Sequence, residues 1–326
     1  MGTDNVVAVV DDYRLTAELE AVLGAVDIAP DGLGARVGER VVEVDGVRAL
    51  WPALSTALYE TFHSGHAHDP STRPGTRDPA LEAALTAGVP HRHTTTLARV
   101  HAGENASDTG WVVDLLDVRV RVPAERVVAV EPDGRAVIRA DAIRPALSPG
   151  FFLCDGSAGS VLGAGPILRF YVHLADATFT PAAWSAALAT LEAWKVPYRA
   201  KAFSNPAGYP RRDALVIYLE EAGWPALESL VEVVSALPGL VDDTSSFAKR
   251  VGPGLAIAWD PADDRTGMRR LSFGEHRSRV VAEGLIKGTA EGISRATAVI
   301  AALRAAGIDP AEPFRNRTSP LLPIGA

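Results

Sequence analysis

Hydrophobic residues recur along the first half of the chain with two different periods, and the period predicts the type of each element. Helical spacing predicts helices over residues 16–24, 51–63 and 78–88. Alternating or short apolar runs predict a strand over 111–122 and hairpins over 40–50 and 126–140, both hairpins turning at Asp-Gly. We therefore expect a mixed α/β region in this half.

The second half shows the same two periods more sharply. Strands are predicted over 167–174, 198–203, 213–219 and 254–259. Helices are predicted over 181–194, 224–237 and 275–306, the last being one long helix or a broken pair. This order predicts an α+β fold, in which a mixed α/β N-terminal region precedes a C-terminal domain with a mostly antiparallel sheet flanked by helices. The glycine-rich stretch 156–165 predicts a connector between domains 1–160 and 161–326.

The composition predicts a folded protein that works in the cytoplasm. Hydrophobic residues make up 47% of the chain and charged residues 22%, which is typical of globular proteins. No apolar run reaches the roughly 18–20 residues that span a bilayer, and acidic residues stand where a signal peptide carries positive charge. We therefore expect no membrane association. The single cysteine, Cys154, excludes a disulfide framework and lies in an apolar run, where it is expected to pack.

Charge is distributed unevenly between the two halves. Residues 1–164 hold 14 Arg, no Lys and 23 acidic residues, whereas residues 165–326 hold 18 basic and 17 acidic residues. The acidic first half argues against nucleic-acid binding, and the nearly neutral second half is where an anionic substrate is expected. Only four of the 32 basic residues are lysines, which draws attention to them because lysine can give up a proton where arginine cannot.

Familiar metal and nucleophile motifs are missing from the sequence. The histidines His63, His66 and His68 lie at a polar loop without His-Glu-x-x-His spacing, and His91 and His93 have the same weakness. The chain has no Gly-x-Ser-x-Gly elbow, and its glycine-rich stretch does not end as a P-loop does. We expect neither a metal ion nor an organic cofactor.

Basic and titratable residues gather on three segments of the second half. Arg169, Tyr171 and His173 alternate along one predicted strand, so they project from one face. Arg199 and Lys201 share a face of the next strand. The other members of the set are Asn205, Tyr209, Arg212, Lys249, Arg277 and Arg279. Each residue alone suits a solvated surface, but cations on neighbouring strands together favour an anion-binding site.

Three stretches resemble the HopA-type effector family: RFYVHL at 169–174, YRAKAFSNPAGYPRRDALVIYL at 198–219 and FGEHRSRVVAEGL at 273–285. The resemblance covers roughly residues 165–287. Its most specific part is the middle stretch, which holds Lys201, Asn205-Pro206, Gly208-Tyr209, Arg212-Asp213 and Tyr218 together. Some members of this family are type III secretion effectors. Others act in actinobacterial pathways that modify ribosomally made peptides, including class V lanthipeptides, and the Arg- and Ala-rich composition favours this biosynthetic branch.

The resemblance implies a phosphoserine and phosphothreonine lyase, a carbon–oxygen lyase that leaves dehydroalanine or dehydrobutyrine in its peptide. In more distant phosphothreonine lyases a lysine on the second strand removes the α-proton, and Lys201 matches that lysine. The general acid stays open between Tyr171 and His173, because Arg169-Phe170-Tyr171 stands where those lyases carry Lys-Phe-His. Arginine grips phosphate oxygens with two parallel donors. The residues expected to bind phosphate or peptide are Arg169, Arg199, Asn205, Tyr209, Arg212, Lys249, Arg277 and Arg279.

The implied partners are a phosphorylated precursor peptide and a separate kinase-like protein that phosphorylates it. Two other interpretations stay open. One is a non-catalytic module that binds the leader of a precursor peptide or the kinase, and the other is an effector-like interaction protein. Replacing Lys201 by Ala separates the lyase from the binding module, because such a module keeps its function without that lysine.

Overall fold

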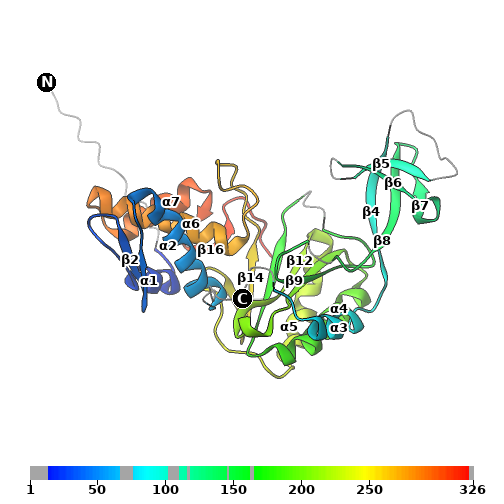
Figure 1. Ribbon diagram of the computed structural model, residues 1–326, viewed down its shortest axis with the longest axis horizontal. Helices are drawn as coiled ribbons and strands as arrows, with labels where there is room; N and C mark the ends of the chain where they lie inside the picture. The colour runs from blue at the N-terminus through cyan, green and yellow to red at the C-terminus, as the bar shows by residue number, and fades with distance from the viewer. Residues whose placement is uncertain are drawn as a thin grey trace. The chain divides into compact units, whose positions relative to one another are not determined.

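The computed structural model describes residues 14–66, 76–101, 110–115, 118–144, 147–161 and 165–322 (Figure 1). Every strand pairing within these residues is antiparallel and helices accompany the sheets, which confirms the α+β fold. The chain forms two compact units. The helical unit comprises the described parts of Met1–Phe62 and Pro261–Thr318, and the sheet unit those of His63–Asp260 and Ser319–Ala326.

The helical unit packs helices beside a small three-stranded sheet. Its helices are α1 (Ala17–Gly24), α2 (Val47–Leu58), α6 (Phe273–Glu291) and α7 (Arg295–Ala305). Its strands are β1 (Val26–Ile28), β2 (Gly34–Val37), β3 (Arg40–Glu43), β15 (Ile308–Asp309) and β16 (Glu312–Asn316). Helices α6 and α7 approach closely, since a Cβ at Gly284 would lie 2.7 Å from the Cα of Val299. Only glycine fits at that contact.

The structure tests the hairpin expected over 40–50 and the final helical stretch. The hairpin expected over 40–50 is wrong, because β3 pairs with the preceding β2 and Asp45-Gly46 leads into α2, with Gly46 as its N-cap. The same short residues that favour a tight turn also favour a helix start, so the local signal was ambiguous. The final helical stretch is the broken pair, since Gly292 adopts a left-handed conformation with φ 66° and ends α6.

The sheet unit is built on a six-stranded sheet in the order β13-β14-β10-β12-β11-β9. Its strands are β9 (Phe151–Asp155), β10 (Leu168–Leu174), β11 (Tyr198–Phe203), β12 (Arg211–Leu219), β13 (Lys249–Gly252) and β14 (Leu255–Trp259). Strand β9 pairs with β11 along its whole length, and in the helical unit α6 packs against α2. The compact units are therefore interleaved along the chain and do not follow a division at residue 160.

One face of this sheet is apolar and is covered by helices α4 (Thr180–Trp194) and α5 (Leu227–Ser235), and α3 (Pro79–Ala87) packs against α4 (Figure 1). Trp184 of α4 packs edge-on against Phe152 with ring centroids 5.7 Å apart, and its Nε1 donates to the backbone oxygen of Leu85 in α3. Trp184 and the inward-facing Phe170 are fully buried. Burial of such side chains stabilises the unit by about 25 cal/mol per Å². We call this side of the sheet the helix face and the other side the Lys201 face.

Short helical turns adjust the ends of several predicted elements. The turns are the π-helical Tyr59–Ser64 and the 3-10 segments Ala124–Arg126, Ala177–Phe179, Pro206–Gly208 and Glu221–Ala226. Helix α4 begins at Thr180, one residue before the predicted start, with Phe179 as its N-cap. Helix α5 begins at Leu227, after a 3-10 turn that contains Pro225.

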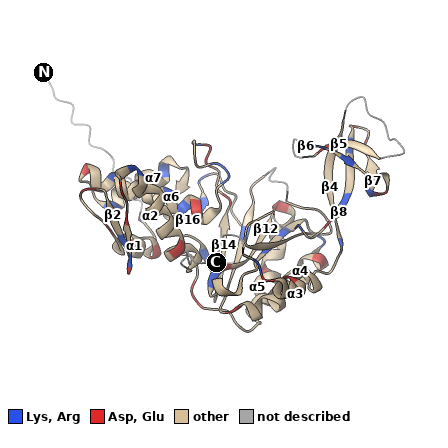
Figure 2. Cartoon of the chain, in the orientation of Figure 1, with Lys and Arg blue, Asp and Glu red and all other residues tan. Residues whose placement is uncertain are grey.

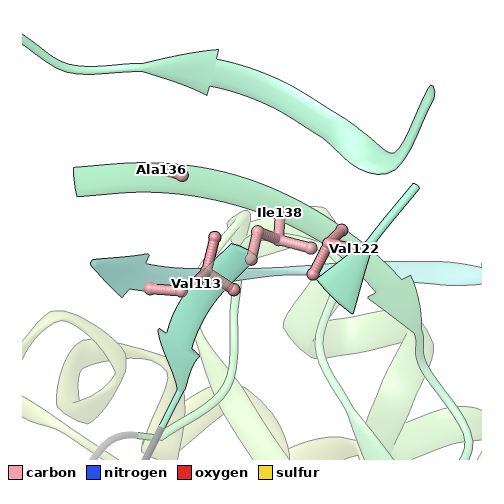
Figure 3. Close-up of a cluster of buried hydrophobic side chains, with 5 residues drawn as sticks. Val113, Val122, Ala136 and Ile138 are labelled. Carbon is pink, nitrogen blue, oxygen red and sulfur yellow. The ribbon is translucent and has the colours of Figure 1, made fainter. Parts of the chain in front are cut away.

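The sheet unit also contains a five-stranded sheet in the order β6-β5-β4-β8-β7. Its strands are β4 (His93–Val100), β5 (Trp111–Leu115), β6 (Val118–Val122), β7 (Val127–Val130) and β8 (Arg135–Asp141). Small apolar side chains, among them Val113 and Ile138, form a separate core on one face of this sheet (Figure 3). The hairpin expected over 126–140 is confirmed as β7 and β8. The single strand expected over 111–122 is two paired strands, β5 and β6.

Candidate active site

The pairing register places several expected site residues in two adjacent rows on the Lys201 face. Successive cross-strand partners in the first row, on β9, β11, β12 and β10, are Leu153, Lys201, Val216 and Tyr171. Successive partners in the second row are Asp155, Arg199, Tyr218 and Arg169. Directly opposed residues of antiparallel strands share a face. The alternating residues of β10 and β11 therefore lie on one surface, and that surface carries three cations.

Lys201 lies half-buried between aromatic rings. Its Nζ is 4.2 Å from the ring centroid of Phe151 and 5.9 Å from that of Tyr218. With respect to the residues that the structure describes, Lys201 makes neither an ion pair nor a hydrogen bond. Contact with ring faces holds an amine in place through cation–π attraction but uses none of its polar valences. The amine is therefore left available to a ligand.

Two arginines flank Tyr218 and are held by carboxylates. Arg199 contacts Asp155 at two points, Nε to Oδ1 at 2.7 Å and Nη2 to Oδ2 at 3.1 Å. Arg169 donates through Nε to Asp260, and its Cζ lies 4.8 Å from the Tyr218 ring centroid. Asp155 is fully buried, and a buried carboxylate needs such partners. The two aspartates therefore fix the orientation of both guanidinium groups.

A pocket of about 350 Å³ opens beside these rows. The residues that line it are Ser148, Leu153, Val161, Ile167, Arg199, Lys201, Tyr218 and Asp260. This volume is in the range of small-molecule sites. Arg199 and Lys201 bring positive charge to the wall, and Asp260 brings a negative charge that its contact with Arg169 offsets. The pocket can hold a small anion beside an amine.

The two expected general acids, Tyr171 and His173, are buried and do not line this pocket. Burial raises the pKa of the Tyr171 hydroxyl well above its ordinary value. The Nδ1 of His173 lies 2.9 Å from the backbone oxygen of Asp243 and 2.7 Å from its Oδ1. Burial lowers the pKa of His173, and contact with Asp243 opposes that effect. Their role as proton donors stays a prediction.

A polar cluster that includes His63 lies in the same unit. The Nδ1 of His63 is 2.8 Å from the Oγ of Ser245, and its ring packs edge-on against Tyr171 with centroids 5.4 Å apart. Burial lowers the pKa of His63 to about 4, although the charge of Asp213 opposes the shift. Burial disfavours the Asp213 carboxylate too, but Arg211 holds the pKa of Asp213 well below its usual range. Sequence reasoning had considered His63 only as a metal ligand.

Three expected substrate ligands are engaged in local structure. The Oδ1 of Asn205 accepts from the backbone amide of Ala207 at 3.1 Å, which caps the turn after β11. The hydroxyl of Tyr209 donates to the backbone oxygen of Phe203 at 2.7 Å. Arg212 contacts the carboxylate of Asp243 through Nε at 2.8 Å. The first two contacts lie in the β11–β12 connection, and the third joins the start of β12 to Asp243, which precedes β13. A contact with substrate stays a prediction for all three.

Lys249 lies on the other side of the six-stranded sheet from Lys201. It pairs with Ile257, which belongs to the helix face, whereas the neighbouring Arg250 pairs with Ala256 on the Lys201 face. A register shift between Arg250 and Gly252 accompanies this pairing. Strand β13 therefore brings Arg250, and not Lys249, to the side that carries the pocket.

Arg277 and Arg279 belong to the helical unit. Arg277 is fully buried and is held at three points, by the backbone oxygen of Pro313, by Asn316 Oδ1 and by His276 Nδ1. Arg279 donates to the backbone oxygen of Gly267 at 2.8 Å. The contacts of Arg277 favour a structural role in joining α6 to β16. Phosphate binding by either arginine stays a prediction.

Sequence reasoning missed three residues that shape the pocket: Tyr218, Asp155 and Asp260. Tyr218 carried a weak signal, because it stands in the most specific stretch of the family resemblance. Asp155 and Asp260 each follow an apolar run at the end of a strand. An acidic residue in that position is common at strand ends, so only the pairing with Arg199 and Arg169 reveals what it does.

The described part of the chain holds neither a metal-ligand cluster nor a membrane-spanning helix. No group of three or more His, Cys, Asp or Glu residues there is arranged to hold a metal ion. His68 of the loop with His63 and His66 lies outside the described residues. None of the described helices is long and apolar enough to cross a membrane.

The fold and the site define an α+β protein with a lysine-bearing, cationic pocket on one face of an antiparallel sheet. A profile of the HopA1 effector protein family matches residues 142–315, more than half of the chain. The chain therefore belongs to the HopA1 effector protein family. The matched segment begins before β9 and includes every strand of the six-stranded sheet.

Two solved structures of effector proteins are similar over most of the chain. One is the effector protein from Pseudomonas syringae pv. tomato strain DC3000, with 14% identity, a TM-score of 0.46, and coverage of 80% of this chain and 90% of that chain. The other is the effector protein from Pseudomonas syringae pv. syringae strain 61, with 14% identity, a TM-score of 0.47, and coverage of 82% and 92%. No curated protein matches the sequence.

Proposed function

We propose that this protein is a phosphoserine and phosphothreonine lyase that eliminates phosphate from a phosphorylated peptide. The observation that carries the proposal is the position of Lys201, an amine on the wall of an anion-compatible pocket whose Nζ lies 4.2 Å and 5.9 Å from the ring centroids of Phe151 and Tyr218. Membership of the HopA1 family supports it, because the resemblance of the Lys201 strand to the base-bearing strand of phosphothreonine lyases lies within the matched segment.

Elimination requires a base for the proton on Cα of the phosphorylated residue. In the proposed reaction the neutral amine of Lys201 takes this proton. The electron pair of the broken C–H bond forms the Cα–Cβ double bond, and the bond between Cβ and the phosphate oxygen breaks. Phosphate leaves with the electrons of that bond. The products are the dehydrated residue and inorganic phosphate, so no oxidant or second substrate is needed.

The phosphate group requires fixed donors, and Arg199 is the residue best placed to supply them. Its Nε and Nη2 are committed to Asp155, which orients the guanidinium plane at the pocket wall. The Nη1 makes no hydrogen bond with a described residue, so its donors are open to a ligand. A charge-assisted bond to phosphate contributes about 1.5–3 kcal/mol. Arg169 adds positive charge from the other side of Tyr218.

A proton donor helps the phosphate to leave, and Tyr218 fits that role better than the residues expected from the sequence. Tyr218 lines the pocket, whereas Tyr171 and His173 do not. Its cross-strand partners are Arg199 and Arg169, which places the phenol between the two phosphate-directed cations. We therefore assign proton donation to Tyr218 and keep Tyr171 as the alternative donor.

We further propose the physiological setting that the family resemblance implies. The substrate would be a ribosomally made precursor peptide whose Ser and Thr residues are phosphorylated by a separate kinase-like protein, and both reactions would take place in the cytoplasm. The proposed chemistry requires no metal ion and no organic cofactor, since base, phosphate ligands and proton donor all come from side chains.

Incubation with a synthetic phosphothreonine peptide, in the presence of excess chelator, tests the activity. The expected result is loss of phosphoric acid from the peptide, followed by mass spectrometry, with release of inorganic phosphate in equal amount. Hydrolysis, which releases phosphate but restores the hydroxyl, would refute elimination. Activity that disappears with chelator and returns with zinc or magnesium would refute the metal-free mechanism. A protein that binds the phosphopeptide without converting it, with and without Lys201, would be the non-catalytic module.

A further inference from the structure

The five-stranded sheet has an apolar face, which holds its small core, and an opposite face rich in arginine. The exposed arginines on this opposite face are Arg99 of β4, Arg119 and Arg121 of β6, and Arg135 and Arg139 of β8. The register aligns them, since Arg99 pairs with both Arg135 and Asp114, and Asp114 pairs with Arg119. We call these five residues the arginine face. Figure 2 marks the basic positions along these strands in blue.

The arginine face is cationic within a chain that is acidic. The strand alternation brings two acidic residues to the same side, Asp114 and Asp141. Asp141 stands at the end of β8 and lies 3.8 Å from Arg126, and Asp114 lies 3.0 Å from His101. The chain as a whole carries a net charge of −8. The sign of this surface is therefore opposite to that of the protein as a whole.

The arginines of this face lie close to one another and to two carboxylates. Arg99 and Arg135 are direct cross-strand partners, and like charges in that position destabilise a sheet. Asp133 lies 2.6 Å from Arg135 and Asp114 lies 3.7 Å from Arg119, and these carboxylates offset part of that repulsion. An anionic partner offsets more of it and accepts charge-assisted hydrogen bonds from the same guanidinium groups. The surface is thus complementary to negative charge spread over several strands.

We propose that the arginine face binds an acidic, extended stretch of the peptide substrate. That this peptide is the substrate rests on the proposed lyase function. Side chains on one side of an extended chain recur about every 7 Å, which is the spacing of Arg119 and Arg121 along β6. Carboxylates at alternate positions of the peptide therefore meet arginines that are already held at the matching interval.

A peptide suits this face better than a nucleic acid. The other side chains on its described part include Thr95, Leu97 and Val137, and the rings that it offers to a base are those of the histidines His93 and His101, with no Phe, Tyr or Trp among the described residues of this face. The net negative charge of the chain also opposes a long polyanion more than a short acidic segment. Leu97 is exposed at the centre of the face and gives an apolar contact for residues between the carboxylates.

Binding of a fluorescent, unphosphorylated peptide in which Glu alternates with Ser tests the proposal in the full-length protein. Fluorescence anisotropy should show saturable binding that weakens as salt is added. The double variant Arg119→Glu/Arg121→Glu should bind at least about tenfold more weakly. The control Arg48→Glu/Arg269→Glu makes the same change in net charge at exposed positions of the helical unit and should stay within about twofold of the wild type.

Equal losses in the two double variants, or no binding by the wild type, would overturn the proposal. A single-stranded oligonucleotide that binds more tightly than the peptide, and is lost in the Arg119→Glu/Arg121→Glu variant, would overturn it in favour of a nucleic acid. The assay involves no phosphate and no turnover, so Lys201→Ala should bind the probe as the wild type does. If the protein fails to eliminate phosphate, peptide binding by the arginine face is still tested by this assay. If the probe fails to bind, the elimination assay still tests the lyase proposal.

Discussion

Lys201→Arg separates a proton-abstracting lysine from a phosphate-binding one at the same position. Arginine keeps the positive charge and the cation–π contact with the rings of Phe151 and Tyr218, whose centroids lie 4.2 and 5.9 Å from the amine. It cannot act as a base, because its pKa stays above about 12. We therefore expect the variant to bind phosphopeptide within a few-fold of the wild type. Elimination should be at least about 100-fold slower, the usual scale for loss of a general base.

The two quantities should be measured on one preparation of the variant. Calorimetric titration with a phosphothreonine peptide gives the affinity, and single-turnover mixing followed by mass spectrometry gives the rate of elimination. Lys287→Arg is a matched control, since Lys287 is exposed on α6 in the helical unit. Elimination by Lys201→Arg at a rate near that of the wild type would refute the assignment of Lys201 as the base.

Chemical replacement of the Lys201 side chain tests the same assignment by restoring activity. Lys201→Cys should be inactive, and alkylation of the new thiol with bromoethylamine should restore activity, because the product is a lysine analogue with sulfur in its chain. The reaction is selective, since the native Cys154 is fully buried and burial raises the pKa of its thiol to about 12. Recovery by this route, and not by alkylation with an uncharged reagent, would identify the amine itself as the required group.

Three further predictions follow from the site and its surroundings. Tyr218→Phe should slow elimination about tenfold or more with little change in phosphopeptide affinity, and a larger loss in Tyr171→Phe than in Tyr218→Phe would return the donor role to Tyr171. Arg277→Ala should lower the free energy of unfolding by about 3–5 kcal/mol, measured by denaturant titration, because it removes a buried cation from three contacts; a fully stable but inactive variant would instead support phosphate binding. His63 should contribute a fall in stability of about 3 kcal/mol as pH drops from 6.5 to about 4, because the unfolded chain protonates His63 in that window and the folded protein does not. A variant His63→Asn with an unchanged pH slope would contradict this attribution.

Local alternation was enough to predict which residues of one strand share a face. Arg169 with Tyr171, and Arg199 with Lys201, share a face because side chains of a strand alternate, and that rule needs no knowledge of partners. The relative position of the residues on β10 and β11 could be found only from the pairing register of the sheet. Only the pairing through β12 shows that Tyr218 stands between Arg199 and Arg169; the family resemblance drew attention to Tyr218 but did not give its neighbours.

Residues outside those two strands could not be assigned from the sequence for a related reason. Lys249 and Arg250 are adjacent cations, so a shift of one position decides which of them shares a face with Lys201. Arg277 looked like a phosphate ligand because it lies in a basic stretch at the start of a helix. Its actual partners, Pro313 and Asn316, come from a strand far along the chain. The local sequence gives the type of a side chain, whereas its role depends on which distant segment of the chain it contacts in the fold.

The carboxylates of Asp155 and Asp260 change how the arginines beside the pocket can bind an anion. Arg199 without Asp155, or Arg169 without Asp260, would be a long, mobile side chain that loses rotamer entropy when it binds phosphate. Fixed by a carboxylate, each guanidinium has already lost that freedom during folding, so a phosphate gains a contact at a smaller entropic cost. The same pairing lowers the net charge of the site and weakens its attraction for anions at long range. We infer that the pocket selects its anion by geometry more than by charge. The variant Arg199→Lys keeps the positive charge but loses the two-point contact with Asp155. It should therefore impair phosphopeptide binding nearly as much as a variant that removes the charge.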